Sequence, residues 1–109
     1  MGPITENEKE KVEFKLIKQI KTSSDVRTLL HFKYKIDPYN ASNLRSIIVC
    51  GQNEGNIDLI DMDNFQNLIS LKQKKISHIY QLIQTSRLNE IAIAAYNGIH
   101  FLTVQSTNY

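Results

Sequence analysis

Two stretches of the chain, a fixed distance apart, share one pattern of apolar runs and turns. Each stretch has two apolar runs joined by a short turn that contains glycine, which predicts a β-hairpin. The runs are residues 46–51 and 57–61 in the first stretch, and 90–95 and 99–104 in the second. Gly55 and Gly98 occupy matching places in the turns, about 43 residues apart, and a repeat of that length restricts the fold to an array of similar units. Such units bury their apolar faces against each other, because one unit cannot do so alone.

The N-terminal part of the chain adds two more predicted strands. In residues 26–36, Leu30, Phe32 and Tyr34 alternate with polar side chains, as expected of a strand with one apolar face. Residues 14–20 also fit a short strand. The charged residues 1–13 show no periodic pattern, so we expect them to form a flexible arm.

Residues 64–86 allow two interpretations. Their apolar side chains can form one stripe of a helix, which would give an α+β fold with a helix over 64–86. They can also form two strands, 67–71 and 76–83, separated by a polar turn. The window contains no Ala or Glu, and the polar run 72–75 interrupts the helical stripe. We therefore expect two strands and keep the α+β fold as the alternative.

The predicted strands and the repeat length together indicate a particular all-β fold. A period of roughly 40–45 residues with four strands per unit is typical of β-propeller blades. We expect an all-β fold of about two antiparallel, four-stranded β-propeller blades over residues 14–105. The extra strand at 14–20 precedes the first full blade. Propellers close in this way, because the first strand of the chain completes the last blade.

Two blades cannot close a propeller, because known propellers have roughly four to eight. The chain would then be a fragment of a larger propeller or one copy in an assembly of several. We therefore expect it to be a homo-oligomer or to dock into the rest of a larger propeller.

The hairpin sequences also resemble a known family. Residues 55–61, Gly-Asn-Ile-Asp-Leu-Ile-Asp, resemble the third-strand pattern Gly-x-Ile-x-Leu-Trp-Asp of the WD-repeat family, and residues 97–101 repeat it in a shortened form. The chain has no tryptophan and no Gly-His pair, and Glu54 and Asn97 stand where the family has a turn aspartate. The blades are therefore degenerate, and the resemblance does not imply the family's hydrogen-bond network.

Composition excludes several classes of function. The 13 Lys and Arg residues exceed the 11 Asp and Glu residues by only two, which is too little for a dedicated nucleic-acid binder. No apolar run approaches the roughly 20 residues that span a bilayer, so we expect no membrane partner. Cys50 is the single cysteine and cannot form an internal disulfide, which favours a cytoplasmic, intracellular location.

No pattern in the sequence is typical of an enzyme. The three histidines are scattered, and none has the spacing of a zinc site. Asp58, Asp61 and Asp63 alternate, but the loop lacks the glycine and the bidentate glutamate of a calcium site, so we interpret them as solvated strand-end residues. We expect no catalytic residue, no metal ligand and no cofactor.

The WD-repeat resemblance implies a non-enzymatic protein–protein interaction scaffold. In that family the binding face is formed by the turn between the second and third strands and by the entry to the innermost strand. The matching residues here are Gln52, Asn53, Glu54, Tyr96 and Asn97 from the turns, and Lys21, Ser24, Lys74, Lys75 and His78 from the entry loops. The basic residues among them predict an acidic protein partner. The α+β alternative would instead be a small dimerising adaptor domain.

Overall fold

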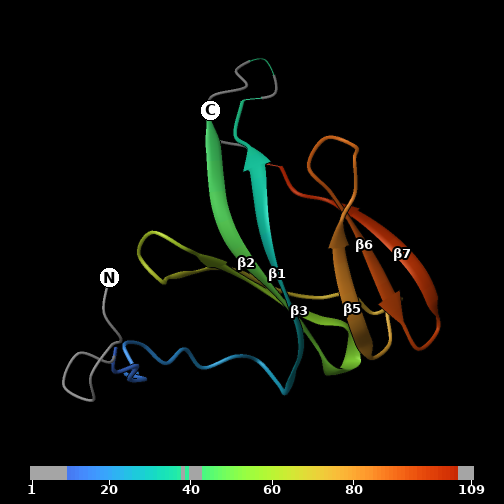
Figure 1. Ribbon diagram of the computed structural model, residues 1–109. Helices are drawn as coiled ribbons and strands as arrows, with labels where there is room; N and C mark the ends of the chain where they lie inside the picture. The colour runs from blue at the N-terminus through green and yellow to red at the C-terminus, as the bar shows by residue number, and fades with distance from the viewer. Residues whose placement is uncertain (1–9, 38, 40–42, 106–109) are drawn as a thin grey trace, which may run out of the picture.

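The structure is a computed structural model that describes residues 10–37, 39 and 43–105, and its strands form two antiparallel sheets (Figure 1). The first sheet contains β1 (Val26–Lys35), β2 (Leu44–Gln52), β3 (Asn56–Asp61) and β4 (Asn67–Lys72). The second contains β5 (Ile79–Gln84), β6 (Glu90–Ala95) and β7 (Gly98–Thr103). The all-β prediction is confirmed. The helix expected over 64–86 in the α+β alternative is wrong, because that window holds β4 and β5.

Each sheet is a meander in which every strand pairs with the next one along the chain. A short 3-10 turn, η2 (Asn53–Gly55), joins β2 to β3, and a turn at residues 96–97 joins β6 to β7. The register of β6 and β7 is regular along both strands. Both predicted hairpins are therefore present. Within the described residues, no helix has the length and apolar character needed to cross a membrane.

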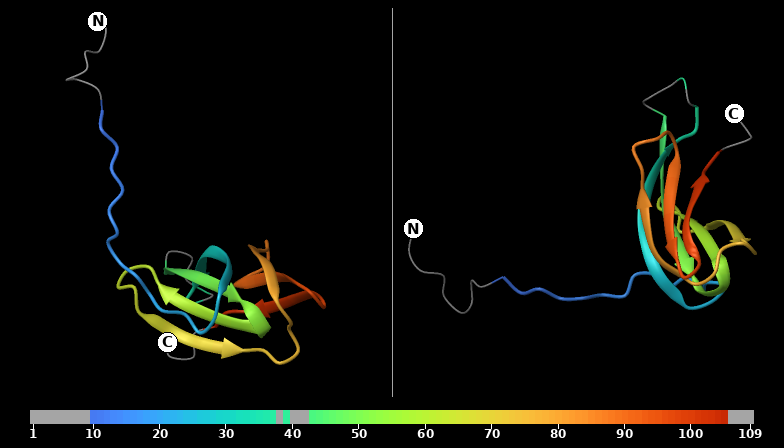
Figure 2. Two further views of the ribbon diagram at one scale, coloured as in Figure 1. Left: turned by 90° about the horizontal axis from the view of Figure 1, so that it is seen from below. Right: turned by 90° about the vertical axis from the view of Figure 1, so that its right-hand side faces the viewer.

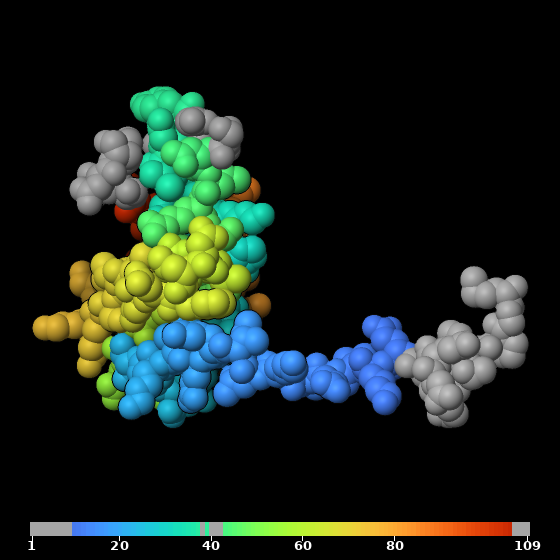
Figure 3. All heavy atoms as spheres, turned by 90° about the vertical axis from the view of Figure 1, so that its left-hand side faces the viewer, coloured from blue at the N-terminus to red at the C-terminus, as the bar shows by residue number. Residues whose placement is uncertain are grey.

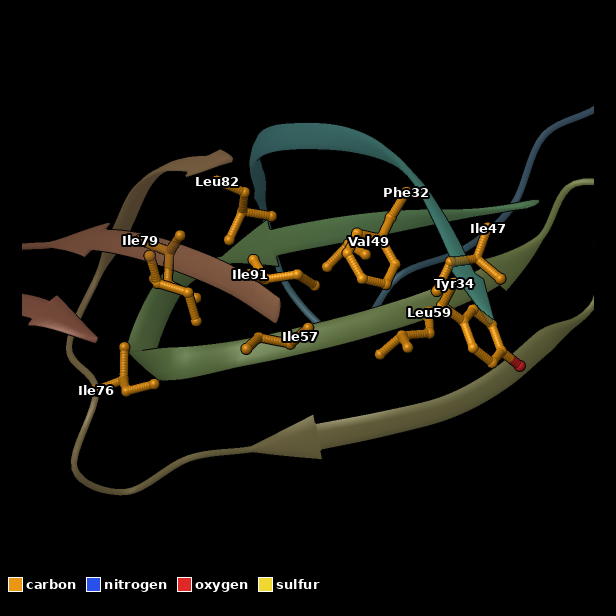
Figure 4. Packing of buried hydrophobic residues seen from close by; sticks show 11 residues of the cluster. Phe32, Tyr34, Ile47, Val49, Ile57, Leu59, Ile76, Ile79, Leu82 and Ile91 are labelled. Atoms are coloured by element: carbon orange, nitrogen blue, oxygen red, sulfur yellow. The ribbon is translucent and has the colours of Figure 1, made fainter. Parts of the chain in front are cut away.

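The hydrophobic core lies between the two sheets (Figure 4). Every second side chain of the first sheet points toward the second sheet, which is the period of two that a strand imposes. Phe32 and Ile47 are fully buried on one side of this core, and Ile79 and Ile93 are fully buried on the other. The rings of Phe32 and Tyr34 stack with centroids 6.4 Å apart. Each such side chain contributes roughly 1.5–3 kcal/mol by leaving water.

A single asparagine also joins the sheets at the end where β1 finishes. The Lys35 backbone N–H donates to Asn89 Oδ1 at 2.8 Å, and Asn89 Nδ2 donates to the Lys35 carbonyl at 3.0 Å. The Val104 N–H donates to the Asn89 carbonyl at 2.8 Å. Asn89 has a φ of 53°, a left-handed conformation that asparagine tolerates better than most residues. We call this arrangement the Asn89 clamp.

Residues 10–22 form no strand. The N-terminal part of this segment extends away from the sheets, blue in Figures 2 and 3, whereas Ile20 and Thr22 are half-buried against the first sheet. The strand predicted over residues 14–20 is therefore wrong in this structure. Phe14 is 98% exposed and Leu16 is 83% exposed, because no other described strand lies beside them. An extended segment without a neighbouring strand gains no ladder hydrogen bonds. Residues 1–9 of the flexible arm predicted over 1–13 lie outside the described residues, and from here on we use the name arm for residues 10–22.

Candidate functional site

Four connecting segments meet at one end of the two sheets, which we call the loop end. They are the entry to β1 (residues 21–25), the β2–β3 turn (52–56), the β4–β5 linker (73–78) and the β6–β7 turn (96–97). All ten residues predicted to contact a partner lie in these segments. The antiparallel meander explains the meeting, because alternate connections of a meander lie at the same end of the sheet.

Side-chain hydrogen bonds tie the linker to both turns. The Glu54 backbone N–H donates to His78 Nδ1 at 3.3 Å. Asn97 Oδ1 accepts the Ser77 N–H at 3.1 Å, and Asn97 Nδ2 donates to the Lys75 carbonyl at 2.8 Å. Three loops from different parts of the chain are thus held in one arrangement.

The entry to β1 is joined to the β2–β3 turn in the same way. Gln52 Oε1 accepts the Ser24 backbone N–H at 2.7 Å and the Ser24 hydroxyl at 3.1 Å. Asn56 Nδ2 donates to Ser24 Oγ at 3.1 Å. Arg27 Nε donates to Asn53 Oδ1 at 2.8 Å. These bonds hold the end of the arm against the first sheet.

The predicted contact residues differ in how much surface they present. Those that are exposed are Lys21, Glu54, Lys74, Lys75, His78, Tyr96 and Asn97, whereas Ser24 and Asn53 are half-buried. Gln52 is fully buried and lies beneath this surface. Its contribution is to hold Ser24 rather than to face solvent.

A buried carboxylate lies close to the loop end. The Ser23 N–H donates to Asp58 Oδ2 at 3.1 Å, and the Ser23 hydroxyl donates to Asp58 Oδ1 at 2.9 Å. Burial by itself raises the pKa of Asp58. Hydrogen bonds from the Ser70, Gln52 and Ser23 side chains and from the Ser23 backbone outweigh that effect, so the pKa lies below its ordinary value of 3.8.

The interpretation of two strand-end aspartates as solvated is therefore wrong. Asp58 is 0% exposed and Asp61 is 3% exposed. At the opposite end of the sheet, Arg45 Nε donates to Asp61 Oδ2 at 3.1 Å, and this guanidinium lowers the pKa of Asp61. Both carboxylates have fixed hydrogen-bond donors, which is what allows a charge to be buried.

In the part of the chain that the structure describes, no three His, Cys, Asp or Glu side chains lie close enough together to hold a metal ion. Cys50 is buried, and burial followed by the nearby charge of Asp58 raises the pKa of its thiol. A buried protonated thiol is a poor nucleophile. Among the described residues, no hydrogen bond joins this thiol to a base.

These features define an antiparallel all-β protein of two packed sheets with an ordered, partly basic loop end. No family model, no curated protein and no solved structure that was compared with the chain matches it.

Proposed function

We propose that the chain is a non-enzymatic protein–protein interaction scaffold that binds an acidic segment of a protein partner at its loop end. The observation that carries the proposal is the joining of four loops, distant in sequence, by side-chain hydrogen bonds at one end of two packed sheets. Rigid elements that present fixed loops are well suited to recognition. Fixed loops also lose little conformational entropy when a partner binds.

We further propose that the two sheets are consecutive blades of a WD-repeat-like β-propeller. The first sheet is a four-stranded meander, and the second is a three-stranded one that follows it along the chain. Their first strands, β1 and β5, lie next to each other, as the innermost strands of neighbouring blades would. The roughly 43-residue spacing of the turn glycines supports the same interpretation.

Charge at the loop end favours an acidic partner. Lys21, Lys74 and Lys75 are exposed. Glu54 lies at the same end, but it is paired with Lys72, whose Nζ is 3.6 Å from Glu54 Oε2. Exposed ion pairs contribute at most about 1 kcal/mol each, so the lysines would steer and orient a partner more than hold it.

The proposal is tested by measuring the binding of fluorescent Asp- and Glu-rich peptides to the full chain by anisotropy. We expect Lys74→Glu with Lys75→Glu to weaken binding at least about tenfold, a loss equivalent to 1.4 kcal/mol. The matched control is Lys33→Glu with Lys35→Glu on β1, which makes the same charge change away from the loop end. It should change affinity less than about twofold.

Two results would contradict the proposal. One is that no acidic peptide binds at low salt, where attraction between exposed charges is strongest. The other is that both pairs of substitutions weaken binding equally, because a site-independent effect of net charge would then explain the attraction.

A further inference from the structure

The outer edge of β7 has no partner strand among the described residues. Edge strands are usually protected by charged residues, proline or a bulge. β7, with the sequence Gly-Ile-His-Phe-Leu-Thr, has no Lys, Arg, Asp, Glu or Pro, and its register with β6 is unbroken. The outer edge of the first sheet differs, because β4 ends in Lys72 and has a register shift in its pairing with β3. Of these two outer edges, the β7 edge is thus the one that lacks features protecting it from another strand.

An apolar hollow of about 200 Å³ opens beside this edge, between the two sheets. Its lining includes Leu102 from β7, Val104 just after it, Ile69 and Leu71 from β4, and core residues such as Ile57 and Ile91. Ile69 is 47% exposed although it points toward the space between the sheets. A fourth strand on β7 would place side chains into this hollow.

The arm has the sequence pattern of a strand but no partner strand among the described residues. Val12, Phe14 and Leu16 alternate with Glu13 and Lys15, which gives one apolar face. The three apolar side chains are between 77% and 98% exposed. One chain therefore carries both an unpaired strand edge and an unpaired amphipathic strand.

The two patterns match in antiparallel register. With Phe14 opposite Leu102, Val12 lies opposite Val104 and Leu16 opposite His100, so these three apolar residues of the arm lie on the side of the hollow. The same register puts Lys15 opposite Phe101 on the other face. A shift by one residue would place the charged residues in the hollow. The pattern therefore specifies which face of the arm is turned toward the hollow.

The arm begins on the face of the first sheet that points away from the second sheet, so it cannot reach β7 of its own copy directly. Ile17 and Ile20 line a hollow of about 430 Å³ together with Leu29, Ile48 and Ile60. Those three residues alternate with core residues, so they lie on the face of the first sheet that points away from the second sheet. The bonds from Ser23 to Asp58 hold the arm's base at this face. The first sheet thus stands between the arm and its own β7.

We propose that the arm of one copy of this chain adds as the fourth strand to β7 of a second copy. Strand addition supplies backbone hydrogen bonds for affinity, and the alternating side chains supply specificity. The same arrangement brings the outward face of the first sheet of one copy toward the outward face of the second sheet of the other. Ile99 and Phe101 are 72% and 57% exposed on that latter face.

The contact is heterologous, because the arm and the β7 edge are different surfaces, and repetition gives a ring if it closes. The number of copies rests on the proposed blades. With two blades per copy and roughly four to eight per ring, it is about two to four. The strand addition itself does not depend on what the loop end binds.

The first test is sedimentation velocity of the full chain at several concentrations. We expect an assembly that Phe14→Ser with Leu16→Ser shifts toward monomer by at least about tenfold in dissociation constant. The matched control is Glu13→Ser with Lys15→Ser, which puts two serines on the other face of the same segment and leaves the net charge unchanged. The control should assemble normally. Because Phe14 and Leu16 are almost fully exposed in their own copy, circular dichroism of both variants should remain that of a folded β protein.

The second test identifies the occupant of the edge. In a Cys50→Ala background, one chain carries Lys15→Cys and another carries Phe101→Cys, and the mixture is treated with a short bismaleimide crosslinker. We expect a crosslinked heterodimer to form in the mixture. A chain with both cysteines should give mainly crosslinks between copies.

Three results would overturn the proposal. The full chain could remain a monomer at high concentration, or the Phe14→Ser, Leu16→Ser variant could assemble as well as its control. The third is a crosslink found only within one chain, which would show that the arm folds back onto its own β7. Each of these results leaves the peptide-binding test of the loop end unaffected.

Discussion

Replacing Gly55 with alanine tests how the two sheets are joined at the loop end. Gly55 has a φ of 75°, in the left-handed region that L side chains rarely adopt. A Cβ atom there would lie 2.5 Å from the Gln73 carbonyl oxygen and would also overlap the Ile76 carbonyl oxygen. Both atoms belong to the backbone of the β4–β5 linker, so no side-chain rotation can relieve the overlap.

The expected cost follows from what must move. The left-handed backbone costs a non-glycine residue about 1 kcal/mol. Displacing the linker disrupts the bond from the Gln73 N–H to the Gly55 carbonyl at 3.1 Å and the bond from the Ile76 N–H to the Gln73 carbonyl at 3.0 Å. Each is worth about 1 kcal/mol. The total is about 3 kcal/mol, a large part of a small domain's stability.

Gly98→Ala is the matched control. Gly98 has a φ of 130°, but nothing lies within 4 Å of the position that its Cβ would take. We expect this variant to lose only about 1 kcal/mol, from the backbone alone. Thermal unfolding at one fixed protein concentration should give melting temperatures about 10 °C apart, because 1 kcal/mol shifts a domain of this size by about 4–8 °C. Equal losses in the two variants would refute the steric argument, and with it the tight approach of the linker to the β2–β3 turn.

Two further predictions concern buried polar groups. Because the pKa of Asp58 is lowered in the folded state, its stabilising contribution is present above its ordinary value of 3.8 and is lost as the pH falls through the lower folded value. In urea unfolding between pH 7 and pH 2.5, the stability advantage of the wild type over Asp58→Asn should therefore shrink with acidity, and an advantage that grows with acidity would contradict the prediction. Asn89→Ala removes both bonds to the Lys35 backbone. We therefore expect the free energy of unfolding, measured with urea at pH 7, to fall by about 2–3 kcal/mol. An unchanged urea midpoint would mean that the Asn89 clamp does not hold the sheets together.

Alternation of side chains was enough to predict most of the strands. The pattern at 26–36 became β1, and the two apolar runs on either side of Gly98 became β6 and β7. These predictions succeeded because each strand has its partner nearby in the sequence, joined by a short turn. The arm shows the limit of the same signal. Val12 to Leu16 has the alternation of a strand, but a strand needs a neighbour, and the pattern does not say where that neighbour is.

The loop end was predicted only in part. The turns and entry loops could be located from glycine, asparagine and lysine positions, and the structure places them at one end. The role of Asp58 was missed, because its burial depends on Ser23, which is 35 residues away, and on Ser70. A usable signal was present, since Asp58 lies inside an apolar run between Ile57 and Leu59. A charge within such a run is expected to have partners.

The Asn89 clamp would affect the curvature of the proposed head-to-tail assembly. The two sheets pack around one core. The clamp joins them at one end, and the backbone contact of the β4–β5 linker with Gly55 holds the linker to the first sheet at the other. In a head-to-tail series of copies, each copy turns the direction of growth by the same angle, so an error of a few degrees per copy accumulates around the circle. A fixed angle between the sheets would allow one copy number to close, whereas a variable angle would give rings of mixed size or open filaments. The single side chain of Asn89 would thus affect the geometry of the proposed assembly.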